Sequence, residues 1–431
     1  MVGVVAGVAP AVQASRPDLT EAMREGGPHA SGSRRKARAR SALVVVEVAL
    51  ALSLVVAAGL LMRSLARVLG APLGFDPANV LTVDLSFPGG RTHGLKGFSN
   101  LNARLVEQVS AIPGVESAAT VNAVPLTNAQ WDFGFYVEGR ERPAPGTEPD
   151  TRVEWISPSY FRTLRIPLLE GREFASTDTY SSPKVLLVNQ AFARRYFKGE
   201  TAVGQHLRML YGFEDEGQFS WEIVGVVGDV RAQGLDKEPP PEVYVSQTQQ
   251  GFRAMNLLVR ARADAGSVAR SVRAIVQGLD PAQAIGRVQP MEQVVTLSVG
   301  SRRFQALLCT AFGALALLLS ALGLYGVIAW SVAQRTQEIG IRMALGAQRA
   351  TVLRMILLEG LKLAAAGLGI GLCGALLATR LLQSQLYGVS ASDPLTYAGV
   401  AALIALVAAA ASLLPARRAA SIAPIDALKS E

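Results

Sequence analysis

The chain is poor in cysteine, histidine, aromatic residues and charge. Of its 431 residues, two are cysteine, three are histidine, 6% are aromatic and 18% are charged, whereas about 25% of an average soluble protein is charged. Cys309 and Cys373 lie inside apolar runs, so we expect no structural disulfide. The histidines are scattered and no H-E-x-x-H or C-x-x-C motif occurs, which argues against a zinc site.

Catalytic signatures are also missing from the sequence. It contains no Gly-Lys pair and therefore no P-loop, whose lysine and backbone amides hold nucleotide phosphates. It has no G-x-S-x-G nucleophile motif, and its polar clusters are interpreted as solvated faces. GIGLCG at 369–374 matches G-x-G-x-x-G but lies within an apolar run, not between a strand and a helix. We expect no enzyme activity, cofactor or metal, so ATP hydrolysis would have to come from a partner.

Long apolar runs are abundant instead. Mean hydropathy is +0.28, and a helix needs about 20 apolar residues to cross a bilayer. Four stretches meet that length, and a buried helix of a large soluble core is the less favoured alternative for them: about 41–63, 304–332, 355–382 and 397–414.

Basic residues flank these stretches unevenly. Lysine and arginine precede the first stretch, separate the second from the third and follow the fourth, whereas the loop 383–394 has none. By the positive-inside rule both termini and the 333–354 loop are cytoplasmic, and 64–303 lie on the other side of the membrane. Four arginines flank the outer ends of the first two stretches and do not follow the rule: Arg63, Arg67, Arg302 and Arg303. We therefore attribute the net charge of +8 to the basic residues that set the membrane topology, and we expect no nucleic-acid binding.

The outer region, 64–303, has the pattern of a mixed α/β fold. Residues 79–87 alternate as a strand, 98–112 carry a helical apolar stripe and 115–124 form a second strand. The same strand, helix, strand order recurs over 255–290. These units bracket a middle part, 151–245, that is rich in short strands, so we expect one lobe built from both ends and a second lobe inserted into it.

Small and charged residues within the apolar runs suggest helix contacts. Gly367 and Gly371 form a G-x-x-x-G pair, which lets helices pack closely in lipid. Glu47 lies about two turns into the first run, where a charge is costly. It either contacts a neighbouring helix or reaches the interface. Glu359 and Lys362 are three apart and are expected to pair locally.

A short charged helix separates the second and third membrane stretches. Its sequence is QRTQEIGIRMALGAQR, residues 334–349. Glu338 and Arg342 are four apart and can pair, Ile339, Met343 and Leu345 lie away from them, and Gly346 can end the helix. The pattern leaves two interpretations even: a helix that docks on a partner protein, or a helix that lies on the lipid surface.

The two ends of the chain share a repeat. At an offset of 405 residues, Pro10, Ala11 and Ala14 match Pro415, Ala416 and Ala419, and 21–24 match 426–429. We interpret 1–40 as a cytoplasmic remnant of a preceding unit plus a basic linker. Chance similarity between two alanine-rich stretches is the alternative.

Several of these segments resemble FtsX-like/MacB-like ABC transporter permeases, and in particular the second half of a duplicated, tandem permease. The segments are 335–347 (RTQEIGIRMALGA), 74–88, 156–174, 188–197 and 415–431. The resemblance implies four transmembrane helices with a large mixed α/β periplasmic domain inserted between helices 1 and 2. It implies a MacB-like core over 64–303 and an FtsX-like permease domain over 304–431. The chain departs from the tandem pattern by lacking the first unit, and it also lacks the fused ATPase domain of some relatives.

The resemblance also implies a function. The chain would be the permease subunit of an ABC-type transporter, coupling a partner ATPase to movement of the periplasmic domain, for efflux or mechanotransmission. It would sit in the lipid of the bacterial inner membrane, with its large domain in the periplasm, as a homodimer or paired with a second permease unit. The resemblance assigns ATPase coupling to seven positions: Glu338, Gly340, Arg342, Ala344, Leu345, Gly346 and Ala347. The alternative is a membrane-anchored periplasmic scaffold or receptor that controls a partner protein without transport, and an outer catalytic domain has least support.

Overall fold

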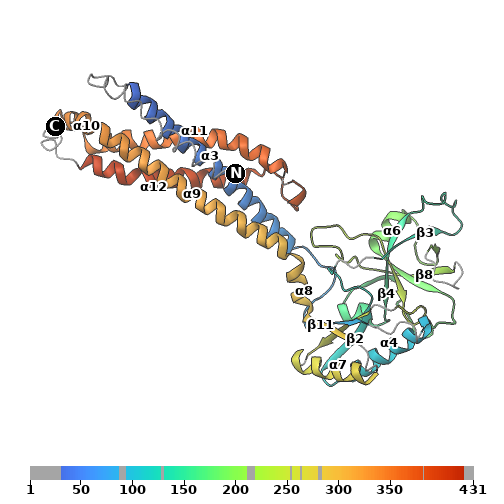
Figure 1. Cartoon of the computed structure of the whole chain (residues 1–431). Helices are drawn as coiled ribbons and strands as arrows, with labels where there is room; N and C mark the ends of the chain where they lie inside the picture. The colour runs from blue at the N-terminus through green and yellow to red at the C-terminus, as the bar shows by residue number, and fades with distance from the viewer. Residues whose placement is uncertain are drawn as a thin grey trace, which may run out of the picture. The chain divides into compact units, whose positions relative to one another are not determined.

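The computed structural model describes residues 31–86, 94–127, 131–210, 219–252, 255–262, 265–279, 284–381 and 383–421. Most of the proposed N-terminal remnant, 1–30, and its matching positions 426–429 lie outside these residues. The chain divides into two compact units. We name 1–63 with 305–431 the helical unit and 64–304 the α/β unit, and describe each by itself (Figure 1).

Four long helices make up most of the helical unit. They are α3 (Ser31–Leu69), α9 (Gly300–Gln334), α11 (Arg349–Leu381) and α12 (Pro394–Ala420). All four are long and apolar enough to cross a membrane, which confirms the predicted number of spans. Each extends beyond its predicted apolar stretch, because a helix continues through polar turns that hydropathy does not count. The unit also holds the short α10 (Thr336–Ala344) and a 3-10 turn, η1 (Gln383–Gln385).

Helix α3 lies at the centre of this bundle. Half of its most apolar window is buried, against 17–28% for the other three helices. Glycines let neighbours approach it closely: Gly313 of α9 faces Val55, and Gly59 of α3 itself faces Thr396 of α12. Figure 1 shows α3 running alongside α9 and α11. The remaining faces of α9, α11 and α12 are largely exposed and apolar, as lipid requires.

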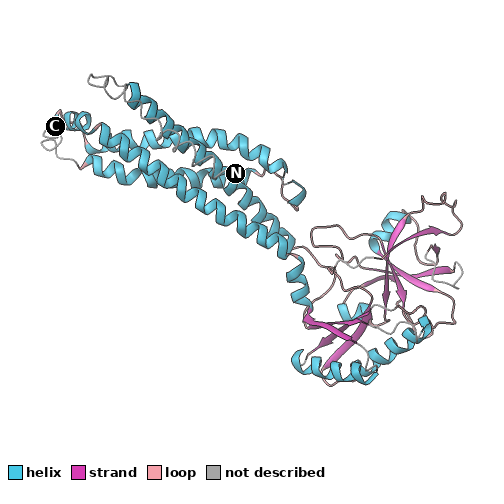
Figure 2. Ribbon diagram, in the orientation of Figure 1, coloured by secondary structure: helices cyan, strands magenta, loops and turns pink. Residues whose placement is uncertain are grey.

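The α/β unit contains one eleven-stranded sheet with helices packed on it (Figure 2). Its strands are β1 (Val80–Ser86), β2 (Val115–Val121), β3 (Asp132–Val137), β4 (Asp150–Ile156), β5 (Leu168–Gly171), β6 (Val185–Asn189), β7 (His206–Met209), β8 (Ser220–Val227), β9 (Glu242–Ser246), β10 (Met255–Ala261) and β11 (Ala284–Pro290). Its helices are α4 (Gly94–Ser110), α5 (Tyr160–Leu164), α6 (Gln190–Tyr196), α7 (Ala265–Leu279) and α8 (Met291–Ser298).

The first lobe of this unit is built from its two ends. Antiparallel strands run in the order β11-β1-β10-β2. Helices α4 and α7 cover them through an apolar core that includes Leu105, Val109, Val268 and Val272. The predicted pairing of an early and a late strand, helix, strand unit is therefore confirmed.

The second lobe is the segment inserted between β2 and β10. Strands β3 to β9 enclose a separate apolar core that contains Trp155, Trp221 and Phe192. Two of its pairings, β4 with β9 and β6 with β8, are parallel. A single residue pair, Val121 with Ile156, connects the ladder of the first lobe to that of the second. The predicted insertion is confirmed, and β4 is the strand that joins the lobes.

Candidate coupling site

Helix α10 is a short elbow between two membrane helices. Only Arg335 separates it from α9, and four residues separate it from α11. It ends where Gly346 adopts a φ of +94°, a conformation that side chains with a Cβ rarely take. There the Leu345 N–H donates to the Ile341 carbonyl at 3.0 Å and the Ala347 N–H donates to the Arg342 carbonyl at 3.0 Å. These bonds satisfy the last carbonyls of the helix.

The two faces of α10 differ in burial. Ile339 is 2% exposed and belongs to the core of the helical unit with Val352 and Ile356 of α11. On the opposite face, Glu338 Oε1 and Arg342 Nη2 are 2.5 Å apart and both side chains are half exposed. The expected i, i+4 pair therefore forms, and α10 is anchored by its apolar side.

The seven positions assigned to coupling do not all reach the surface. Glu338, Arg342, Ala344, Leu345 and Gly346 are exposed, Ala347 is half-buried and Gly340 is buried. Leu345 departs from the sequence expectation: it is 83% exposed rather than aligned with Ile339. Helical spacing explains this, because Leu345 follows Glu338 by seven residues and Arg342 by three and therefore shares their exposed face. The expectation that it lies away from this pair is wrong.

A polar contact that the sequence analysis missed joins the elbow to α11. Glu359 accepts from Ser331 Oγ at 3.2 Å and pairs with Arg335 Nη1 at 3.4 Å. The expected Glu359–Lys362 pair is wrong, since the carboxylate turns toward the end of α9. Nothing local indicates this, because Arg335 and Glu359 are 24 residues apart.

Arginine–aromatic contacts hold the other helix ends near the elbow. The Arg40 guanidinium of α3 lies 5.0 Å from the centre of the Trp330 ring of α9. Arg418 of α12 donates to the Tyr325 hydroxyl of α9 at 3.2 Å. Aromatic residues beside cations are typical of membrane interfaces, so this signal was available in the sequence.

Within the bundle, small residues meet α3. A Cβ placed on Gly367 would lie 2.6 Å from Val48 Cβ, and one on Gly371 would lie 2.9 Å from Ala49 Cα. A Cβ on Gly323 of α9 would overlap the Glu47 carboxylate, so Glu47 packs against a neighbouring helix. This supports the first of the two interpretations of Glu47.

An ion pair connects α3 and α12 at the opposite end of the bundle from α10. Asp393 caps α12 by accepting from the Thr396 N–H at 2.9 Å and from its hydroxyl at 2.6 Å. Arg63 of α3 also donates to Asp393. The Thr396 hydroxyl, then its N–H, and then Arg63 lower the pKa of Asp393 below its usual 3.8.

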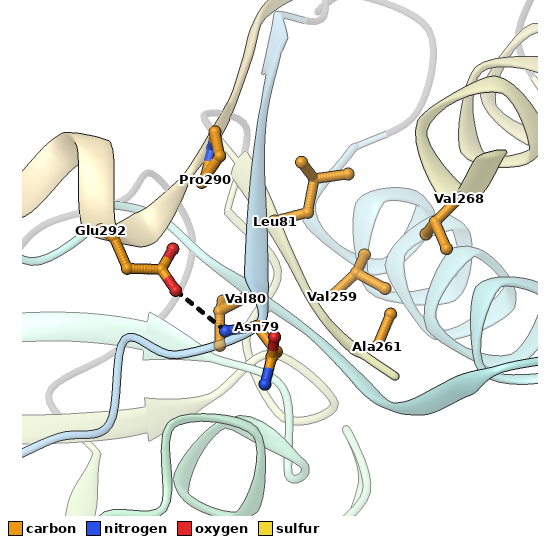
Figure 3. Close-up of a pocket in the computed structure, with 8 residues that line it drawn as sticks. All are labelled: Asn79, Val80, Leu81, Val259, Ala261, Val268, Pro290 and Glu292. Carbon is orange, nitrogen blue, oxygen red and sulfur yellow. Dashed lines mark hydrogen bonds between the residues drawn. The ribbon is translucent and has the colours of Figure 1, made fainter. Parts of the chain in front are cut away.

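In the α/β unit, two contacts fix the segment that leads into α9. Asn79 adopts a φ of +59°, which asparagine tolerates, and its N–H donates to Glu292 Oε1 of α8 at 3.0 Å. Figure 3 shows this bond at the edge of a cavity of about 240 Å³ with Leu81 and Val259 in its wall. Arg302 Nη2 lies 2.5 Å from Asp236 Oδ2. Among the residues that the structure describes, no group of three or more His, Cys, Asp or Glu side chains is placed to hold a metal.

Known families match both parts of the chain. Residues 41–275 match the MacB-like periplasmic core domain, and residues 310–424 match the FtsX-like permease C-terminal domain. Similar solved structures include the periplasmic region of MacB from Actinobacillus actinomycetemcomitans, which is 16% identical with a TM-score of 0.35 and covers 52% of this chain and 94% of that one.

Curated relatives of this chain include a permease and two ATP-binding/permease proteins. The uncharacterized ABC transporter permease YknZ of Bacillus subtilis is 27% identical over 66% of this chain and 71% of its own length. The pyoverdine export ATP-binding/permease protein PvdT of Pseudomonas putida is 27% identical over 62% of this chain, and the macrolide export ATP-binding/permease protein MacB of Wolinella succinogenes is 23% identical over 82%. The chain spans 41% and 52% of those two relatives. With more than half of its residues matched by one family and a second family covering most of its last three long helices, the chain belongs to the ABC transporter permeases that have a MacB-like periplasmic core domain and an FtsX-like permease C-terminal domain.

Proposed function

We propose that this chain is the permease subunit of an export-type ABC system and that α10 is its coupling helix. A partner ATPase would bind the exposed face of α10 and displace it during ATP hydrolysis. Helix α9, which is continuous with the α/β unit, would carry that displacement to it, and the α/β unit would act on the exported molecule. We also propose that two permease units assemble side by side, because the exposed apolar face of α9 needs either lipid or a second copy.

The observation that carries this proposal is the anchoring of α10. Its buried residue Ile339 inserts between residues of α11, and Glu359 ties α11 to both Ser331 and Arg335. A force on α10 therefore acts on α9 and α11 together instead of bending a free loop. A helix that only lay on lipid would need none of these contacts.

The exposed residues of α10 suit a protein partner. Leu345 and Ile341 are 83% and 44% exposed, next to the Glu338–Arg342 pair. An apolar side chain flanked by charges is typical of a docking surface that is specific and reversible.

The proposed topology places α10 and both termini in the cytoplasm and the α/β unit outside the membrane. The uneven basic flanks support this orientation. A maleimide that cannot cross the membrane should label a cysteine introduced at Gln348 only after the cells are opened, and one at Glu200 in cells whose outer membrane is permeabilised. Labelling of Gln348→Cys in intact cells would refute the topology.

Co-purification with a partner ABC ATPase tests the docking claim. Arg342→Glu and Leu345→Asp should each abolish capture of the ATPase. Arg342→Glu also breaks the pair within α10, so the matched control is the double swap Glu338→Arg with Arg342→Glu, which restores that pair with reversed charges. We expect the swap to lose the ATPase as well. Recovery of the ATPase by the swap would show that helix stability, not docking, explains the single variant.

A further inference from the structure

Strands β4 and β9 carry charged residues on the face that does not enter the apolar core. They pair in parallel, with Arg152 opposite Glu242 and Glu154 opposite Tyr244. Because side chains alternate along a strand, Trp155 enters the core of the second lobe while Arg152 and Glu154 lie on the other face. The sequence pattern predicts that such a polar face is solvated.

That prediction is wrong, because the face is sealed from solvent. Arg152, Glu154 and Glu242 are 3%, 5% and 1% exposed. Aromatic rings close the site, with the Phe161 ring of α5 standing edge-on to the Tyr244 ring at 5.1 Å. We refer to Arg152, Glu154, Glu242 and Tyr244 as the acid cluster. Fully buried carboxylates are rare unless they are paired.

The pairing within the acid cluster is incomplete. Arg152 lies 3.8 Å from one oxygen of Glu154 and 3.8 Å from one oxygen of Glu242, too far for hydrogen bonds. Tyr244 donates to the other oxygen of Glu242 at 2.7 Å. Within the described residues, Glu154 Oε2, Glu242 Oε1 and two nitrogens of Arg152 have no hydrogen-bond partner. One guanidinium therefore faces two carboxylates, and full ionisation would leave one negative charge uncompensated in the protein interior.

The surrounding groups add to this excess of negative charge. Burial raises the pKa of Glu242 to about 7; the Tyr244 hydroxyl and Arg152 oppose the rise, and Asp229 and Asp132 add to it. Burial, followed by the charge of Glu242, raises the pKa of Glu154 well above its usual value.

Tyrosine hydroxyls complete the surroundings of the acid cluster. Burial and the nearby carboxylates raise the pKa of Tyr244 and of Tyr160 in α5, so both hydroxyls stay neutral. Arg152 is thus the single cation among the groups that act on the two carboxylates.

We propose that Glu154 and Glu242 form a proton-binding site, which releases one proton to water as the pH rises through neutrality. The larger rise in pKa is that of Glu154, so the proton released first comes from Glu242. Before release the arginine faces two carboxylic acids and the site carries a charge of +1. After release it faces one carboxylate and one carboxylic acid, and the charge is zero. The site lies on β4, the strand that joins the two lobes through Val121 and Ile156.

The direction of the pH effect follows from the pKa of Glu242. In the unfolded chain the carboxyl has its usual pKa of 4.5, whereas in the folded chain it is about 7. Between these values the folded state binds more protons than the unfolded state, so the free energy of unfolding falls as pH rises. The stabilising contribution is complete below 4.5 and is lost as pH rises through about 7.

Infrared difference spectroscopy of the full chain in lipid nanodiscs tests the site directly. A pH step across neutrality should remove one carboxylic-acid carbonyl band per chain in the wild type. Glu242→Gln should abolish that change, because the proton released near neutrality is that of Glu242. Glu107→Gln is the matched control, since Glu107 is exposed on α4 of the same unit. Absence of the band in the wild type, or its persistence in Glu242→Gln, would overturn the proposal.

Unfolding followed by tryptophan fluorescence gives a second, independent readout. Trp131, Trp155 and Trp221 lie in the α/β unit, so the signal reports mainly on that unit. The denaturant midpoint of the wild type should decrease as pH rises through neutrality, and Glu242→Gln should flatten this dependence while the Glu107→Gln control retains it. A variant with the full wild-type pH dependence would show that the acid cluster does not bind the proton.

Discussion

Three glycines of α11, spaced two residues apart, provide a sharp test of how the helical unit is held together. A Cβ on Gly371 would lie 2.9 Å from both the Cα and the carbonyl oxygen of Ala49, which are backbone atoms that no rotamer change can move. A Cβ on Gly367 would lie 2.6 Å from Val48 Cβ. On Gly369 it would meet no described atom within 4 Å. We therefore expect Gly371→Ala and Gly367→Ala to destabilise the unit and Gly369→Ala to be tolerated.

The magnitude follows from two opposing effects. Forcing a methyl group into a packed interface costs about 1–3 kcal/mol. Replacing glycine by alanine in a helix contributes up to about 1 kcal/mol in the opposite direction. Gly371→Ala should thus lose about 1–2 kcal/mol of stability, or roughly 2–8 °C in Tm at about 2–4 °C per kcal/mol, while Gly369→Ala should match or slightly exceed the wild type.

The assay is thermal unfolding of the purified full chain in one detergent, with the fraction still monodisperse measured after heating. Far-UV circular dichroism should show unchanged helix content at low temperature for all three variants. Equal losses for Gly369→Ala and Gly371→Ala would mean that glycine acts through helix flexibility. A Gly371→Ala protein as stable as the wild type would refute the close approach of α11 to α3.

Three further substitutions test other contacts. Gly323→Val should displace Glu47 and lower Tm in the same assay by an amount similar to Gly371→Ala, since it also overpacks an interface with α3. Arg63→Ala should raise the pKa of Asp393 toward 3.8, measured by carboxyl NMR titration. A lowered carboxyl pKa stabilises the folded state only while the carboxyl of the folded chain is ionised. As acid is added, the variant should therefore lose stability of the helical unit at a higher pH than the wild type. Asn79→Val should strain a residue held at φ +59° and cost about 1–2 kcal/mol in the tryptophan unfolding assay, whereas Asn79→Gly should be nearly neutral.

The membrane helices and the two lobes were predictable because their signals are local. A bilayer demands an uninterrupted apolar run, and such runs stand out against any polar sequence. The strand, helix, strand order at both ends of the outer region likewise needs only alternation and helical spacing. These signals do not predict the length of a helix. Helix α11 begins at Arg349, in a polar segment that hydropathy alone assigns to a loop.

The contacts that define the coupling site could be predicted only in part. The Glu338–Arg342 pair follows from spacing, and so does the exposed position of Leu345, although the sequence interpretation placed it away from that pair. The partner of Glu359 depends on how α9 and α11 cross, and sequence spacing carries no information about that. Its nearest opposite charge in sequence, Lys362, was therefore the wrong choice.

The acid cluster shows a deeper limit of sequence patterns. Arg152 and Glu154 alternate with apolar residues, the pattern of a strand with one wet face. Their burial results from α5 and its aromatic residues, which cover that face of the paired strands β4 and β9. Burial of a strand's polar face is thus a tertiary property, and it is also what gives a carboxylate there a pKa within the range that a cell experiences.

Rigidity of the helical unit is what the proposed mechanism requires, and α3 supplies it. Arg40 at one end of α3 contacts Trp330 of α9, and Arg63 at the other end pairs with Asp393 of α12. Between these ends, glycines of α11 lie in close contact with α3. They leave no room for α11 to slide past α3 without separating from it. Under the proposed mechanism, a displacement of α10 would therefore move the bundle as a body, because the alternative, bending one helix alone, would break a polar contact at an end or open a packed interface.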